Sequence, residues 1–127
     1  MAYVEDWLAA EARAARGVWL AGFSGGALLA GALALRAPQR YAGVALLHGT
    51  LPFGAGCDPA PDQLAGCEVF YGYGESDAVI PSDLIARSRD YLRGASGARA
   101  EIHAYRAGHE IPPAEQRDLA RWYAALT

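Results

Sequence analysis

Short apolar runs and amphipathic segments alternate along most of this chain. Apolar residues at intervals of three and four positions predict helices, whereas short apolar runs without that spacing predict strands. The predicted helices cover residues 4–15, 27–37, 81–92 and 113–126, and the predicted strands cover residues 18–21, 41–47, 68–71 and 100–105. Helices are expected to end at Gly17, Pro38 and Gly94, and the stretch 48–66, rich in glycine and proline, is predicted to be a loop.

The order of these elements indicates an α/β fold. Strands separated by helices favour a parallel sheet, because each crossover returns the chain to the same end of the sheet. The run 100–105 alternates between polar and apolar residues, which is typical of a strand near a sheet edge. We therefore predict a single α/β domain over residues 1–127, with a parallel sheet of about four strands flanked by helices.

The overall composition narrows the possible function classes. Hydrophobic residues make up 53% and charged residues 20% of the chain, as in ordinary globular proteins. A net charge of −3 gives no basic surface for nucleic acid. Cys57 and Cys67 could close a disulfide, but a protein with an adequate core needs no such link, so we expect reduced thiols. We also expect a cytoplasmic location. No Cys and His residues have the spacing of a metal site, so no metal is expected.

The uncharged segment 17–35 is about long enough to span a membrane. Its five glycines, the central Ser24 and the acidic residues that precede it argue against that interpretation. A strand, a tight turn and a buried helix explain the segment better. We therefore expect no membrane span.

The sequence Gly-Phe-Ser-Gly-Gly at residues 22–26 lies between a predicted strand and a predicted helix. This is the context of a nucleophile elbow, in which a sharp turn lifts the serine hydroxyl off the end of the sheet. Ser24 is therefore the predicted nucleophile, and a plain turn serine is the alternative. The helix that follows points its N-terminus at the reacting centre, so the N–H of Gly25 is the predicted oxyanion donor.

A serine nucleophile needs a base and an orienting carboxylate. Both should follow strands, because parallel sheets place their sites at the carboxyl ends of strands. Asp77 follows the third predicted strand and His109 the fourth, in the chain order Ser, Asp, His of α/β-hydrolases. The alternatives for the acid are Glu75 and Asp83, and the alternatives for the base are His48 and His103.

These segments together resemble the phospholipase/carboxylesterase group of α/β-hydrolases, which includes the acyl-protein thioesterases. The resemblance covers about residues 2–127 and rests on the elbow, on Glu-Ser-Asp-Ala-Val-Ile-Pro at 75–81 and on Gly-His-Glu-Ile-Pro at 108–112. It implies Ser24 as nucleophile, Asp77 as orienting acid and His109 as base. Members of the group more often carry a residue larger than glycine at the position of Gly25.

The match is to the C-terminal portion of the group only. Full-length members carry further strands before this region, with a loop that donates the second oxyanion N–H. The resemblance therefore implies a truncated α/β-hydrolase fold that lacks the N-terminal strands. In the family's sheet the strand 18–21 is paired on both sides, so here it is expected to lie at an exposed, uncharged edge. We predict a homodimer that buries this edge near Val18–Ala21.

The predicted function is hydrolysis of small acyl esters or thioesters through an acyl-enzyme, without a cofactor. The predicted substrate contacts are Phe23 beside the nucleophile, His48 on the rim of the site, and Leu51 and Phe53 lining an acyl pocket. One alternative is a truncated, weakly active or inactive hydrolase that serves as a structural or binding unit. Acyl transfer to an acceptor other than water is a further alternative.

Overall fold

The computed structural model describes residues 17–54 and 58–127. Its elements are β1 (Val18–Phe23), α2 (Gly25–Arg36), η1 (Pro38–Arg40), β2 (Tyr41–Leu47), β3 (Glu68–Gly74), α3 (Ser82–Asp90), η2 (Tyr91–Ala95), β4 (Arg99–Tyr105) and α4 (Pro113–Leu126). The helix predicted over residues 4–15 lies outside the described residues.

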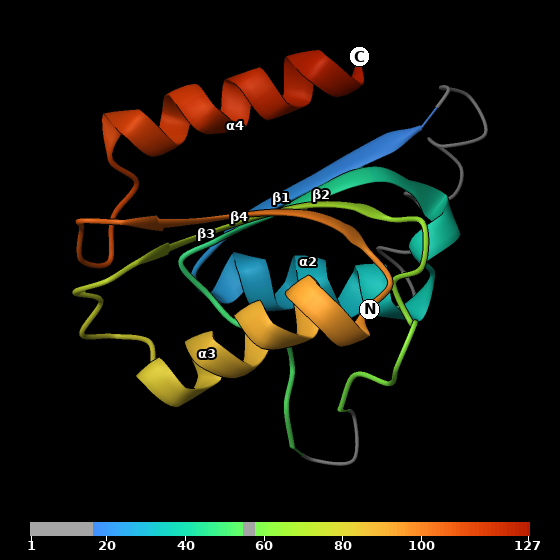
Figure 1. The fold of residues 1–127 in the computed structure, drawn as a ribbon, viewed down its shortest axis with the longest axis horizontal. Coiled ribbons are helices and arrows are strands. Elements are labelled where there is room, and N and C mark those ends of the chain that lie inside the picture. The colour runs from blue at the N-terminus through green and yellow to red at the C-terminus, as the bar shows by residue number, and fades with distance from the viewer. Residues whose placement is uncertain (1–16, 55–57) are drawn as a thin grey trace.

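The four strands form one parallel sheet in the order β1-β2-β3-β4. Helices α2 and α3 cover one face of the sheet and α4 covers the other (Figure 1). The predicted α/β fold with a parallel sheet is therefore confirmed. The strand predicted to lie near an edge, now β4, is the edge strand opposite β1.

Successive residues of β2 point to opposite faces of the sheet. Val44 and Leu46 belong to the core under α2, whereas Ala45 and Leu47 belong to a smaller cluster with Trp122 of α4. All four strand residues are at most 5% exposed. Burial on both faces explains why this strand is apolar throughout its length.

Two strands run further than predicted. β1 continues to Phe23, so Ser24 follows the strand directly. β3 continues from Tyr71 to Gly74, because its last residues pair with β4, including Gly72 with His103. Hydrogen bonding to a neighbouring strand thus overrides the low strand propensity of glycine.

The uncharged segment 17–35 folds into β1, the turn at Ser24 and most of α2. Within the described parts of the chain, no helix has both the length and the apolar character needed to cross a bilayer. Because all strands are parallel, the residues that follow β1, β2, β3 and β4 emerge at the same edge of the sheet. This edge carries the side chains considered next.

Candidate functional site

Ser24 occupies the sharp turn between β1 and α2. Its φ of 59° and ψ of −117° place a non-glycine residue in a strained conformation. The backbone N–H of Ser24 donates to the carbonyl of Leu47 at 2.9 Å, which fixes the turn to the end of β2. A side chain at Gly22 would collide with the backbone oxygen of Gly26, so this close approach of strand and helix requires glycine.

Hydrogen bonds link Ser24 to His109 and His109 to Asp77. The Nε2 atom of His109 lies 2.9 Å from Ser24 Oγ, and its Nδ1 atom lies 2.9 Å from Asp77 Oδ2. Nδ1 carries a hydrogen if it donates to the carboxylate, which leaves Nε2 free to accept from the serine hydroxyl. The structure thus brings together the three residues that the sequence singled out, in an arrangement suited to proton transfer from the serine.

The Asp77 carboxylate is held at both oxygens. Its Oδ1 accepts hydrogen bonds from the backbone N–H groups of Val79 at 2.8 Å and Ile80 at 3.0 Å, while Oδ2 faces His109. Burial acts to raise the pKa of Asp77, but the hydrogen bonds with His109, Ile80 and Val79 outweigh it and hold this pKa below its ordinary value. The carboxylate is therefore ionised at neutral pH.

Gly25 and Phe23 flank the serine. Gly25 is exposed and opens the first turn of α2, where backbone N–H groups and the positive end of the helix dipole lie. The Phe23 ring is 39% exposed, with its centroid 4.9 Å from that of His109. A residue in this position can contact a group bound at Ser24.

His48 was expected on the rim of the site, and this prediction is wrong. The residue is 1% exposed and lies close to Asp77 and His109, with a positive φ of 54°. Its Nε2 atom is 2.6 Å from Glu115 Oε1, and its Nδ1 atom is 3.9 Å from Asp77 Oδ2. The first turn of α4 places Glu115 against the ring, and this contact helps to bury the imidazole.

Sequence reasoning missed Glu115. This residue lies in the first turn of α4, yet its exposure is 0%. A side chain at Gly72 of β3 would collide with Glu115 Oε2, so the glycine makes room for the carboxyl group. A glycine inside a strand can mark such a close approach, and Gly72 was the available signal.

The two residues expected to line an acyl pocket, Leu51 and Phe53, both pack against the core beneath α2. Leu51 is 1% exposed and belongs to the core beneath α2, which corrects its expected role. The side chain of Leu51 packs into the core because Gly31 of α2 leaves space for it. Phe53 is partly buried against the same core, and the Arg87 guanidinium lies 4.2 Å from its ring centroid.

The other acids and histidines considered from the sequence do not join this arrangement. Glu75 is exposed, and Asp83 lies in the first turn of α3. His103 bonds Glu101 at 2.7 Å within β4 and stacks on Tyr105. Among residues 17–54 and 58–127, no group of three His, Cys, Asp or Glu side chains is placed to hold a metal ion.

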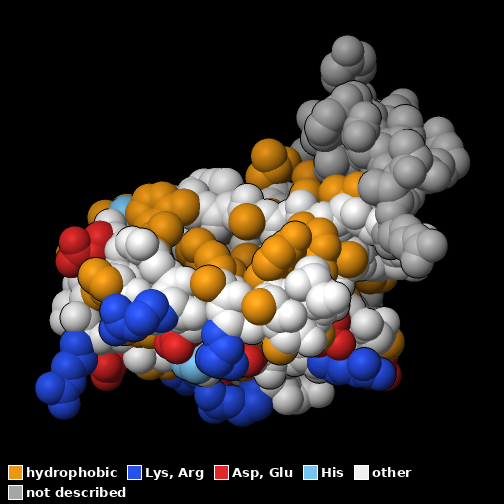
Figure 2. All heavy atoms as spheres, turned by 90° about the horizontal axis from the view of Figure 1, so that it is seen from above, with side chains coloured by type: hydrophobic (Ala, Val, Ile, Leu, Met, Phe, Trp, Pro, Cys, Tyr) orange, Lys and Arg blue, Asp and Glu red, His pale blue; other side chains and the backbone are white. Residues whose placement is uncertain are grey.

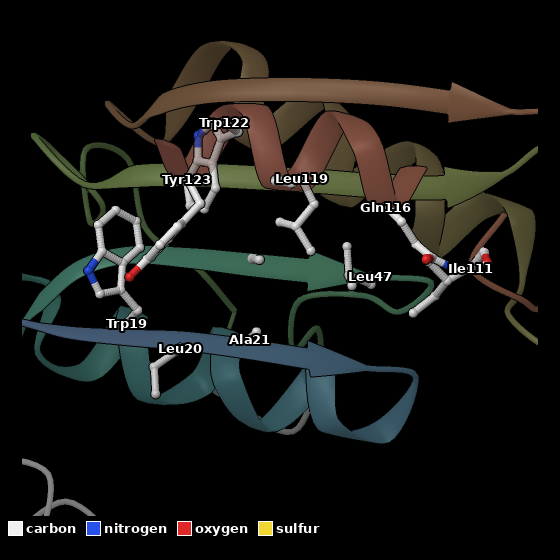
Figure 3. A pocket seen from close by; sticks show the side chains of 11 residues that line it. Trp19, Leu20, Ala21, Leu47, Ile111, Gln116, Leu119, Trp122 and Tyr123 are labelled. Carbon is white, nitrogen blue, oxygen red and sulfur yellow. Dashed lines mark hydrogen bonds between the residues drawn. The ribbon is translucent and has the colours of Figure 1, made fainter. Parts of the chain in front are cut away.

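An apolar groove with a volume of about 440 Å³ runs between β1 and α4. Figure 3 shows Trp19, Leu119 and Tyr123 along it, with Leu47 and Ile111 towards the carboxyl ends of the strands. Figure 2 shows hydrophobic side chains gathered over this face of the molecule. Such a patch is typical of a surface that another chain or ligand covers.

Comparisons with known proteins show the family to which this chain belongs. A family model described as phospholipase/carboxylesterase matches residues 2–126. The structure resembles a carboxylesterase from Bacillus cereus, with 27% identity and a TM-score of 0.78 over 97% of this chain and 57% of that one. No curated protein matches the sequence.

Two plant proteins share the fold. A variant of SOBER1 from Arabidopsis thaliana is 23% identical, with a TM-score of 0.81 over 98% of this chain and 62% of that one. Acyl-protein thioesterase 2 from Zea mays is 20% identical, with a TM-score of 0.65 over 84% of this chain and 54% of that one. The chain thus spans somewhat more than half the length of these structures. Because the family model matches almost every residue, the chain belongs to the phospholipase/carboxylesterase family and has the fold of the α/β-hydrolases.

Proposed function

We propose that this chain is a serine hydrolase that cleaves carboxylic esters or thioesters of small acyl groups. In this proposal Ser24 is the nucleophile, His109 the base and Asp77 the orienting acid. The main support for this proposal is a pair of 2.9 Å contacts, one from Ser24 Oγ to His109 Nε2 and one from His109 Nδ1 to Asp77 Oδ2. Membership of the phospholipase/carboxylesterase family supports the same reaction class.

The proposed reaction begins with attack of Ser24 Oγ on the acyl carbonyl carbon. His109 Nε2 takes the hydroxyl proton as the new C–O bond forms, and Asp77 stabilises the imidazolium that results. The N–H of Gly25 donates to the oxyanion of the tetrahedral intermediate. Collapse of the intermediate expels the alcohol or thiol, which takes the proton from His109, and leaves an acyl-serine.

Water completes the proposed cycle. His109 removes a proton from the water as it attacks the acyl-serine, and then returns that proton to Ser24 Oγ. The acid is released and the enzyme regains its starting state. In this proposal His109 Nε2, which lies 2.9 Å from the serine oxygen, is the proton acceptor or the proton donor in every transfer.

Two observations support an acyl ester as the proposed substrate: the similarity to a carboxylesterase and the apolar surface beside His109. The carboxylesterase from Bacillus cereus is 27% identical to this chain, which favours an ester substrate. The exposed ring of Phe23 beside His109 supplies apolar contact for an acyl or leaving group.

A fluorophosphonate probe tests the proposal directly, because it reacts with a serine only when a neighbouring base activates the hydroxyl. We expect stoichiometric labelling at Ser24, located by peptide mass spectrometry, and none in the Ser24→Ala variant. Ser82→Ala, which alters an exposed serine of α3, is the matched control. A folded wild-type protein that the probe leaves unlabelled would instead favour an idle hydrolase fold with a structural or binding role.

We also propose that two copies of the chain associate through β1. This strand pairs only with β2 in the described sheet, and its residues from Val18 to Phe23 carry no charge. The apolar groove between β1 and α4 lies beside the free edge. A second copy that covers both would satisfy the edge hydrogen bonds and remove the patch from water.

A further inference from the structure

His48 and Glu115 form a fully buried pair beneath the proposed triad. The exposure of His48 is 1% and that of Glu115 is 0%, and their contact between Nε2 and Oε1 measures 2.6 Å. β2 delivers the histidine and the first turn of α4 delivers the glutamate. Burial of two ionisable side chains costs free energy unless they are well paired, and this pair lies directly beside Asp77.

The free ring nitrogen of His48 faces the triad. Its Nδ1 atom lies 3.9 Å from Asp77 Oδ2, the same oxygen that His109 Nδ1 contacts at 2.9 Å. Among the described residues, His48 Nδ1 has no hydrogen-bond partner. The carboxylate of Asp77 is thus flanked by two imidazoles, one catalytic in the proposed reaction and one buried.

The number of protons shared by His48 and Glu115 decides whether His48 Nδ1 faces Asp77 with a lone pair or with an N–H group. With a bare Nδ1, His48 would direct a lone pair at the Asp77 carboxylate, and two acceptors would face each other in a site with little water. With one more proton, Nδ1–H points at Asp77 whether the shared proton sits on His48 Nε2 or on Glu115 Oε1. In the second state Nδ1–H faces one carboxyl group and the shared proton lies between the ring and the other, so no two acceptors face each other.

We propose that His48 and Glu115 are positioning residues that hold a hydrogen on His48 Nδ1 towards Asp77, and so fix the carboxylate that orients His109. The inference rests on the proposed serine hydrolase mechanism and adds a second layer to it. In this proposal Glu115 shares a proton with His48 Nε2, the Nδ1–H of His48 faces Asp77 Oδ2, and the backbone N–H groups of Val79 and Ile80 hold Oδ1. Neither His48 nor Glu115 touches the reacting atoms.

The surroundings of the pair leave few other groups to set its protonation. The His109 ring lies 6.3 Å from the His48 ring, centroid to centroid, and the Phe23 ring lies at 5.8 Å. On the side of β4, Tyr105 lies near Gly72 and Glu115, and its hydroxyl donates to Asp118 at 2.8 Å. The nearest charge facing His48 Nδ1 is therefore Asp77.

A double variant, His48→Leu with Glu115→Leu, separates positioning from packing. Replacing both members of a buried polar pair by apolar residues often leaves stability nearly unchanged, whereas removing one member strands the other. The matched control is Ser96→Ala, which removes a fully buried hydroxyl three residues before β4, at the other end of the sheet. Active sites are counted with the fluorophosphonate probe before kinetics with a p-nitrophenyl ester.

In the double variant we expect kcat to fall about ten- to a hundred-fold, as for a catalytic group displaced by about 1 Å, while KM changes less than about three-fold. The acidic limb of the pH–kcat/KM profile should move to higher pH. Without the facing N–H, Asp77 attracts the proton on His109 more strongly, so a higher pH is needed to free the base. Ser96→Ala should leave kcat and the limb in place.

A folded double variant with kcat within about two-fold of wild type would overturn the proposal, as would an equal fall in the Ser96→Ala control. If the double variant does not fold, nitrogen-15 NMR of histidine in the wild-type protein decides. A protonated Nδ1 on His48 at neutral pH supports the proposal, and a bare Nδ1 overturns it. Failure of the wild type to react with the probe would instead overturn the proposed hydrolase function, so the two failures are distinguishable.

Discussion

His109 Nε2 lies 2.9 Å from Ser24 Oγ, although 85 positions separate the two residues in sequence. Ser24 follows β1 at one edge of the sheet and His109 follows β4 at the other, so three strand spacings of about 4.8 Å separate the strands themselves. The turn after β4 must therefore carry His109 back across the carboxyl ends of the strands. Asp77, which follows β3, meets the histidine on this path.

Ser24→Ala should reduce hydrolysis of a short p-nitrophenyl ester by at least about a thousand-fold, because no other group replaces the nucleophile. The fold should be preserved, since the hydroxyl makes no cap hydrogen bond to α2. Initial rates and circular dichroism of the variant measure the two effects. A folded variant that keeps more than about a tenth of the wild-type rate would exclude Ser24 as the nucleophile.

Asp77→Asn should make the protein less sensitive to acid. The pKa of Asp77 in the fold lies below its ordinary value of 3.8, so the carboxylate stabilises the native state above that value and loses this effect as the pH falls through the folded pKa. The advantage of the wild type in free energy of unfolding should therefore be largest near neutral pH and shrink below about pH 4.

Urea denaturation at neutral pH and near pH 3 measures this difference. Asp83→Asn, in the first turn of α3, is the matched control and should not reproduce the effect. A difference between wild type and Asp77→Asn that stays constant over the range would contradict the hydrogen-bonded, ionised carboxylate.

Cys67 should be nearly inert to thiol reagents in the folded protein. Burial, with a smaller contribution from Glu68, raises the pKa of the Cys67 thiol to about 11, so little thiolate is present at pH 8. In a Cys57→Ser background we expect reaction with iodoacetamide at least about a hundred-fold slower for the native than for the urea-unfolded chain. Equal rates would show that the start of β3 opens readily.

The proposed homodimer predicts a specific effect of charge at β1. Ala21 is exposed on the free edge strand and lines the apolar groove, so Ala21→Arg should place a charge in the interface and give monomers. Ala104→Arg, exposed on the opposite edge strand β4, is the matched control and should leave the dimer intact. Sedimentation of the three proteins at micromolar concentration tests this. A monomeric wild type would contradict the proposed homodimer.

Much of the architecture could be predicted because local patterns carry it. Apolar runs separated by segments with helical periodicity were enough to predict a parallel sheet. The glycines around Ser24 were enough to predict a strand, a tight turn and a helix. The general rule that parallel strands share their carboxyl ends then predicted that Asp77 and His109 would meet near the serine. The extent of β3 was underestimated because Gly72 and Gly74 read as loop residues until β4 pairs with them.

Only the tertiary structure decided which polar side chains are buried. Glu115 has the local signature of a solvated acid in a first helical turn, and His48 that of a polar residue at a strand end. Burial depends on the surface that packs over a residue, and that surface comes from distant parts of the chain. Here the first turn of α4 brings Glu115 against His48, and Gly72 leaves room for the carboxyl group. The sequence alone thus determined the fold class and the meeting of Ser24, Asp77 and His109, whereas packing placed a second imidazole and its carboxyl partner beneath them.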